Sequence, residues 1–309
     1  MTELQGVLPV WKPEGWTSHD VVAKVRGIIR ERRIGHTGTL DPQVTGVLPL
    51  CVGKATRLVE YLQELPKQYE CVLRFGIATD TEDMSGTVLE RKDASFITEE
   101  DVRQVIQSFI GEIEQVPPMY SAVKVDGKRL YELAREGKTV KRQSRQVTVY
   151  DIDILDMNMG TSEPTVHFLV TCSKGTYIRT LCVDIGRSLE VPSTMDSLIR
   201  TMSAHYTKDQ CYTMEQIQEK AAEGDVSSIL IPVDEAISYL PKITIMDEFA
   251  HFATQGRGIP FRACSCQPLT NQLYRLYDVR GLFYGLFHVP DGERALRPVK
   301  VFLPSSDPK

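Results

Sequence analysis

The sequence has no apolar run long enough to cross a membrane. The longest runs, such as Gly46 to Gly53, fall far short of the roughly 18–20 residues that a membrane helix requires. Residues 1–10 show no basic stretch ahead of an apolar one, which is the pattern of a signal peptide. No internal repeat and no low-complexity stretch is visible. We therefore expect a cytoplasmic globular protein that does not engage a membrane.

The sequence also has no cysteine framework. Its seven cysteines are an odd number, scattered along the chain. Cys264 and Cys266 form one C-x-C pair, but no second pair stands at the spacing of metal ligands. We expect reduced thiols and no bound metal.

An overall excess of positive charge is missing as well, because 36 Lys and Arg face 41 Asp and Glu. The basic residues are concentrated in segment 124–145. It contains Lys124, Lys128, Arg129, Arg135, Lys138, Lys141, Arg142 and Arg145 against Asp126, Glu132 and Glu136. A basic segment on an acidic body is typical of a protein with one nucleic-acid face, and an ordinary solvated helix and loop is the alternative.

The apolar patterns of the first 240 residues predict mixed helices and strands. Thr17 or Ser18 caps a helix with an arginine-rich outer face. Capping boxes at Thr98-x-x-Asp101 and Thr213-x-x-Gln216 begin two further helices. Strands are expected at Val47–Val52, 69–77, 146–155 and 165–172, and helices around 178–189 and 193–202.

Turn signals complete the pattern. Asp126-Gly127 predicts a tight hairpin at the start of the basic segment. After Pro241 the sequence changes to short strands such as Leu273–Val279 and Leu282–Val289, joined by an Arg280-Gly281 turn. We place a domain boundary near residue 240.

The most informative stretch is a glycine-rich loop at 34–41, followed by Pro42. Its sequence is Gly35-His36-Thr37-Gly38-Thr39-Leu40-Asp41-Pro42. The two glycines permit unusual backbone angles, and Pro42 pushes Asp41 towards an extended conformation. The loop therefore holds a carboxylate stiffly, although Asp before Pro alone is typical of an ordinary turn.

The extended motif around this loop resembles the active-site region of the TruB family of tRNA pseudouridine synthases. It reads G-H-T-G-T-L-D-P-x-x-T-G-V-L-P-L and follows Lys12-Pro13-x-Gly15-x-x-Ser18. Two more family blocks follow in order, from Val116 to Lys124 and from Lys174 to Arg179. The resemblance covers most of residues 5–206.

The resemblance implies an α+β fold with two domains. The expected catalytic domain, residues 1–240, has a mixed, mainly antiparallel sheet with flanking helices. An insertion at about 119–145, which contains the basic segment, would clamp RNA. Residues 241–309 would form a small β-rich, PUA-like RNA-binding domain.

The resemblance also implies the chemistry, which converts the uridine at position 55 in the T-arm loop of tRNA into pseudouridine. The enzyme breaks the N1–C1′ bond, rotates the base and rejoins it through C5, with no cofactor. Asp41 is expected to act as the nucleophile, and Arg179 to keep its carboxylate charged. The uridine must leave its stack, so Tyr69 is expected to receive the flipped base and to serve as a possible general base.

Four further residues receive roles from the same resemblance. Tyr177 and Leu198 are expected to wall the uracil pocket, and His36 to occupy the space that the base vacates in the RNA loop. Lys12 is expected either to support the Asp41 loop or to contact phosphate. From pattern alone Tyr69 is a half-buried strand residue and Leu198 a core residue.

Three alternatives remain at this point. The guide-RNA-dependent branch of the family shares the chemistry, but the clamp-like insertion favours a stand-alone monomer that acts on the T-stem and loop. A non-catalytic RNA-binding module would not need Asp41, Tyr69 and Arg179. A glycosidase would need a second paired carboxylate, and none is evident. The family's glycine and phenylalanine after residue 203 are replaced here by Ala204, His205 and Tyr206.

Overall fold

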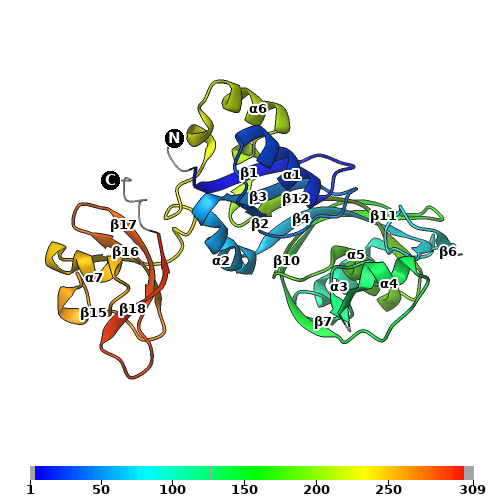
Figure 1. The fold of residues 1–309 in the computed structure, drawn as a ribbon. Coiled ribbons are helices and arrows are strands. Elements are labelled where there is room, and N and C mark those ends of the chain that lie inside the picture. The colour runs from blue at the N-terminus through cyan, green and yellow to red at the C-terminus, as the bar shows by residue number, and fades with distance from the viewer. Residues whose placement is uncertain (1–3, 126, 303–309) are drawn as a thin grey trace.

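A nine-stranded sheet forms the body of the protein (Figure 1), whose computed structural model describes residues 4–125 and 127–302. Its main path runs β1-β3-β12-β4-β11-β10-β7, with β2 paired to β3 and β13 to β12. All these pairs are antiparallel except β3 with β12. The strands are β1 (Gly6–Lys12), β2 (Ile34–His36), β3 (Thr45–Val52), β4 (Lys67–Phe75), β7 (Gly111–Gln115), β10 (Arg145–Asn158), β11 (Thr165–Cys172), β12 (Ser193–Ser203) and β13 (Tyr206–Thr207). The expected mixed, mainly antiparallel sheet is thus confirmed.

The helix expected around 193–202 is wrong, because these residues form β12 in the middle of the sheet. Met195, Leu198, Ile199 and Met202 stand at helical spacing. The spacing arises because register shifts between Met195 and Ser197, and between Arg200 and Met202, interrupt the alternation of a regular strand. The loop expected at 34–41 also differs, since its first three residues form β2.

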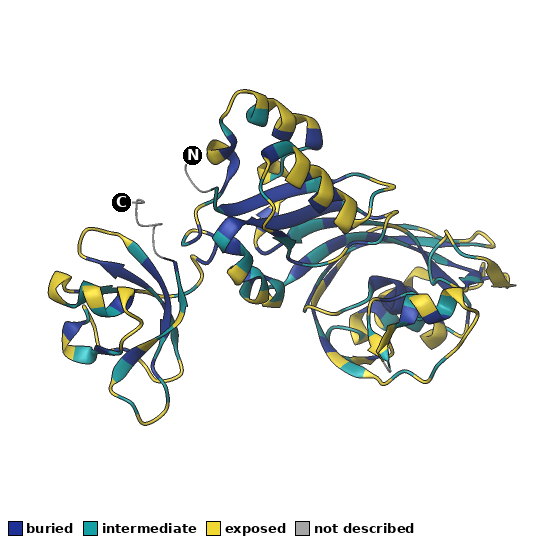
Figure 2. Ribbon diagram, in the orientation of Figure 1, coloured by how far each residue is buried: buried dark blue, intermediate teal, exposed yellow. Residues whose placement is uncertain are grey.

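The helices cover the sheet in two groups, each with its own buried cluster. α1 (Ser18–Ile29) and α6 (Met214–Ala222) pack beside β1 and β3. α3 (Glu99–Ser108) and α5 (Ile178–Ser188) pack inside the curved half of the sheet around β4, β10 and β11 (Figure 1). Figure 2 shows the buried residues gathered where these layers meet. The predicted capping boxes at Thr98 and Thr213 are formed, and of the two candidate caps of α1 it is Thr17 that caps the helix, also in a capping box.

The remaining elements of the body are short. They are α2 (Val59–Glu64), α4 (Leu130–Arg135), η1 (Gly53–Leu58), η2 (Lys208–Gln210), η3 (Val226–Ile229), β5 (Ile77–Thr79), β6 (Val88–Arg91), β8 (Lys124–Val125) and β9 (Lys128–Arg129). β8 and β9 pair antiparallel on either side of the predicted hairpin turn, at which Gly127 has φ +84°. Asp126, the other residue of that turn, lies outside the described residues.

The C-terminal part has a sheet and a core of its own, so the expected β-rich region is confirmed. Its strand order is β14-β16-β17-β18-β15. The elements are β14 (Lys242–Ile245), η4 (Asp247–Phe249), α7 (Ala250–Thr254), β15 (Ile259–Pro260), η5 (Phe261–Ala263), β16 (Leu273–Asp278), β17 (Phe283–His288) and β18 (Ala295–Val301). Leu286 and Phe302 join a buried cluster of the body, and Arg275 donates to the carbonyls of Asp234 and Leu240. Within residues 4–302, position 126 aside, no helix is long and apolar enough to span a membrane.

Candidate active site

Asp41 lies on the loop that joins β2 to β3, and the buried side chain of Lys12 forms a hydrogen bond to this loop. The Lys12 side chain is 0% exposed, and its Nζ donates to the carbonyls of Pro13, Trp16 and Pro42. Ser18 Oγ accepts a hydrogen bond from Leu40 N at 2.9 Å. Burial lowers the pKa of Lys12 to about 8, an effect that the Asp41 carboxylate opposes. The backbone thus occupies all three Nζ donors, and one of the acceptors, Pro42, belongs to the Asp41 loop.

The structure brings together two residues that lie far apart in the sequence, Asp41 and Arg179. Arg179 Nη2 is 3.0 Å from Asp41 Oδ2, and the arginine comes from the first turn of α5. The Asp41 side chain is 44% exposed, whereas that of Arg179 is only 5% exposed. The carboxylate therefore faces solvent, where a substrate can reach it, while its cationic partner is fixed in the protein.

Arg179 is fixed by several further acceptors. Nη2 also donates to the carbonyl of Tyr120 at 2.8 Å, and Nη1 donates to the carbonyl of Thr81 at 2.8 Å. Asp83 Oδ2 lies 3.9 Å from Nη1. Because the guanidinium is planar with its donors in a rigid fork, these contacts set its orientation towards Asp41.

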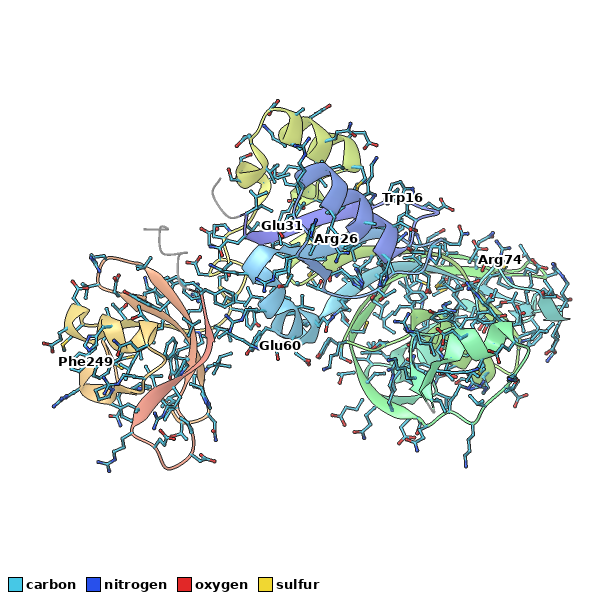
Figure 3. All side chains as sticks on the ribbon, in the orientation of Figure 1. Trp16, Arg26, Glu31, Glu60, Arg74 and Phe249 are labelled. Atoms are coloured by element: carbon cyan, nitrogen blue, oxygen red, sulfur yellow. The ribbon has the colours of Figure 1, made fainter. Side chains whose placement is uncertain are left out.

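Tyr69 lies on β4 directly opposite Arg200 on β12, and Tyr69 is 8% exposed. Burial raises the pKa of the Tyr69 phenol, and the charge of Arg200 opposes that shift. The phenol is therefore neutral near neutral pH, and it offers a ring and a hydroxyl donor. Arg74, labelled in Figure 3, lies on the opposite face of β4 and pairs with Asp196 at 2.9 Å.

Arg200 belongs to the site but was missed by the sequence reasoning. It is 1% exposed, and its guanidinium donates to the carbonyls of Val47 at 2.7 Å and Gly38 at 3.2 Å. It thus connects β12 to both ends of the segment that contains Asp41. The available signal was an arginine between the apolar residues Leu198-Ile199 and Met202, which can indicate a buried cation. In a helix, however, Arg200 would lie on the surface.

Lys67 is a second missed residue, and it resembles Lys12 and Arg200 in its environment. It is buried on the same face of β4 as Tyr69, and its Nζ donates to the carbonyls of Gln63 and Leu65, each at 2.8 Å. Burial lowers its pKa to about 8, and the charge of Arg200 adds to the effect. Three buried cations, each with backbone carbonyls as hydrogen-bond partners, therefore lie around the Asp41 loop and the neighbouring end of β4.

Tyr177 and Leu198 border this region from two elements. Tyr177 immediately precedes α5, and its backbone exchanges two hydrogen bonds with the Gln115 side chain, at 2.9 and 3.0 Å. The guanidinium carbon of Arg145 lies 4.6 Å from the centre of the Tyr177 ring. Leu198 is partly buried and stands opposite Cys71 on β4, two residues before Arg200.

His36 is at the other end of the loop, on β2. Its Nδ1 accepts a hydrogen bond from Gly38 N at 3.3 Å, and its ring lies 5.6 Å from the ring of His19. Burial lowers the pKa of His36, and the charges of His19 and Arg200 lower it further. The imidazole is therefore neutral at physiological pH, which suits contact with a base better than contact with a phosphate.

A cluster of metal ligands and a large cavity are two other features that can mark a functional site. No group of three or more His, Cys, Asp or Glu side chains could hold a metal ion in the described part of the chain. A cavity of about 1480 Å³ is lined by residues of α1, α6 and β17 and by none of the seven predicted site residues.

Sequence models of two protein domains match most of the chain. The sequence model of the TruB family pseudouridylate synthase N-terminal domain matches residues 26–178, and that of the tRNA pseudouridylate synthase B C-terminal domain matches residues 179–238. The chain is 43% identical to a tRNA pseudouridine synthase B of Bacillus cytotoxicus, over 99% of this chain and 100% of the relative. It is 47% identical to one of Geobacillus thermodenitrificans, over 82% of this chain and 85% of the relative.

A solved structure shares the fold as well. The crystal structure of a Cbf5-Nop10-Gar1 complex contains a chain that is 28% identical to this one, with a TM-score of 0.73. The alignment covers 97% of this chain and 85% of that chain. The similarity therefore extends over both the body and the C-terminal sheet.

Proposed function

The chain belongs to the TruB family of pseudouridylate synthases, and from this premise we propose that it isomerises the uridine at position 55, in the T-arm loop of tRNA, without a guide RNA. The relatives named tRNA pseudouridine synthase B match nearly the whole chain, which supports tRNA as the substrate. The protein would act as a monomer in the cytoplasm.

The observation that carries the proposal is the ion pair between Arg179 on α5 and Asp41, whose loop is held by hydrogen bonds to its backbone. In the reaction, the N1–C1′ bond breaks, a C5–C1′ bond forms, and a proton leaves C5 while another is gained at N1. Asp41 supplies the ionised carboxylate, as nucleophile or as charge stabiliser at the sugar. Arg179 stabilises that negative charge from a fixed position, so little reorganisation is needed during the reaction.

The flipped uracil would lie between the aromatic and apolar side chains beside Asp41. Tyr69 offers its ring and a neutral hydroxyl, and Tyr177 and Leu198 border the same space. His36, neutral and partly exposed, would fill the position that the base leaves in the RNA loop. Lys12 has a supporting role in this proposal, because its three donors already serve the backbone.

The basic insertion at about 119–145 would hold the T-stem through its phosphates. Lys138 and Lys141 are exposed and suited to this role. Arg142 is only partly exposed and donates to the carbonyl of Pro117, so it is better suited to fixing the base of the insertion. Residues 1–240 would form the catalytic domain, and residues 241–309 a PUA-like domain with further RNA contacts.

The test is to incubate the purified protein alone with an unmodified tRNA transcript and to map pseudouridine by position. We expect modification at position 55 only, and none in a transcript that carries cytidine there. Modification at another position would contradict the proposed specificity. Activity that appears only after a guide RNA is added would favour the guide-dependent alternative.

A further inference from the structure

Glu82 adopts a backbone conformation that residues other than glycine rarely take. Its φ is +64°, and it lies in the turn that joins β5 to β6. The sheet holds it there, since its carbonyl accepts a hydrogen bond from Met195 N at 3.1 Å, and Asp83 forms a bridge with the same residue. Strained residues that the surroundings hold in place are concentrated at functional sites.

The Glu82 side chain links this turn to α5. Its Oε2 accepts a hydrogen bond from Thr180 Oγ1 at 2.7 Å, and Thr180 directly follows Arg179. Burial raises the pKa of the Glu82 carboxyl, the charges of Arg179 and Arg142 oppose this, and Asp184 adds to it. Burial of the charged carboxylate costs free energy. In this position its hydrogen bond to Thr180 connects the turn to α5 beside Arg179.

The same turn provides the acceptors of one end of the Arg179 guanidinium. Nη1 donates to the Thr81 carbonyl at 2.8 Å and lies 3.9 Å from Asp83, and these residues flank Glu82 on both sides. Nη2 at the other end reaches Asp41 at 3.0 Å. Because the guanidinium is rigid and planar, a shift of Nη1 also shifts Nη2.

We propose that Glu82 is a positioning residue for the reaction. Through Thr180 it holds the turn 80–87 against α5, and the turn holds Arg179 in the orientation that pairs it with Asp41. The inference rests on the proposed function, and it assigns to Glu82 no contact with RNA and no proton transfer.

The test compares variants by single-turnover rate and by tRNA affinity. Glu82→Ala and Thr180→Val should each lower the rate about tenfold, since small misplacements of a catalytic group have effects of this order or larger. The double variant should be no slower than either single one, and affinity should stay within about twofold. Glu82→Gln keeps an acceptor for Thr180 and should restore most of the rate. Glu90, which is exposed on β6 of the same hairpin, is the control, and Glu90→Ala should match the native protein.

Several results would overturn the proposal. These are a native rate in Glu82→Ala, effects of Glu82→Ala and Thr180→Val that multiply, or a loss of tRNA affinity as large as the loss of rate. A crystal structure of Glu82→Ala gives a readout independent of activity, because the distance of 3.0 Å between Arg179 and Asp41 should lengthen. If the native protein modifies no tRNA, the proposed function fails, whereas an unchanged distance in this variant removes the role of Glu82.

Discussion

The close approach of β3 to β12 at Gly46 yields the most sharply defined prediction. Gly46 has φ +125°, and a Cβ added there would lie 2.3 Å from the carbonyl oxygen of Arg200 and 2.6 Å from its nitrogen. Real Cβ contacts are not shorter than 3.0 Å, so Gly46→Ala must separate the two backbones by about 0.7 Å. Both obstructing atoms belong to the main chain and cannot rotate away.

The cost can be built from two contributions. Holding alanine at this φ costs about 1–2 kcal/mol, as for other residues kept in a sparsely populated backbone region. Weakening the hydrogen bonds of the short parallel pair between Thr45–Gly46 and Ile199–Arg200 adds about 1–3 kcal/mol. The sum of about 2–5 kcal/mol corresponds to a fall in Tm of about 3–8 °C, because the entropy of unfolding grows with chain length and is about 0.65 kcal/mol/K for 309 residues. The rate should fall as well, because Arg200 would no longer reach the carbonyls of Gly38 and Val47 together.

The assay is thermal unfolding by circular dichroism, combined with pseudouridine formation. The matched control is Gly27→Ala, since Gly27 lies inside α1 with nothing within 4 Å of an added Cβ. Alanine there should stabilise the helix by about 0.5–1 kcal/mol. If Gly46→Ala kept the native Tm and rate, the close contact between β3 and β12 would not exist as described.

Three further predictions concern charge. Asp41→Asn should keep tRNA affinity within about twofold and abolish turnover, and substantial residual pseudouridine would remove Asp41 from the chemistry. Replacing Lys138 and Lys141 together with Gln should weaken tRNA binding and reduce the slope of log affinity against log salt by about one per lysine, whereas an unchanged slope would exclude them from the RNA contact. The folded pKa of Lys67, about 8, lies below the ordinary 10.5. The unfolded chain therefore binds more protons between these values, so this lysine's contribution to the free energy of unfolding should rise with pH there. Denaturant titrations at pH 8 and 10 measure this change in the free energy of unfolding. It should increase less between the two pH values in Lys67→Met than in the native protein. Equal increases in the two proteins would refute the lowered pKa of Lys67.

Signals that act within a few residues predicted the fold well. The capping boxes at Thr98 and Thr213 depend only on residues three positions apart, and both helices begin where expected. The alternation from Tyr69 onwards reflects one buried face, and β4 follows it. Each of these patterns is complete before any distant part of the chain is in place.

Features that depend on distant contacts were harder to predict. The sequence predicts a helix in place of β12 because two register shifts interrupt the alternation of the strand, and these shifts follow from its pairing with β4. Arg200 was missed together with the strand that carries it. Asp41 and Arg179 are far apart in the sequence and are brought together only by the fold, so composition and spacing do not predict their pairing. Only the resemblance to a family suggests it.

Two of the buried cations, Lys12 and Arg200, have a consequence for how the site can change. They donate hydrogen bonds to carbonyl oxygens of the Asp41 loop, those of Pro42 and Gly38, and every amino acid has such an oxygen whatever its side chain. The path of the loop is thus encoded by residues outside it, and its own outward side chains do not have to maintain it. Substitutions at positions such as Thr39 or Gln43 can therefore vary the surface presented to RNA while Asp41 remains in place, which separates the evolution of recognition from that of the chemistry.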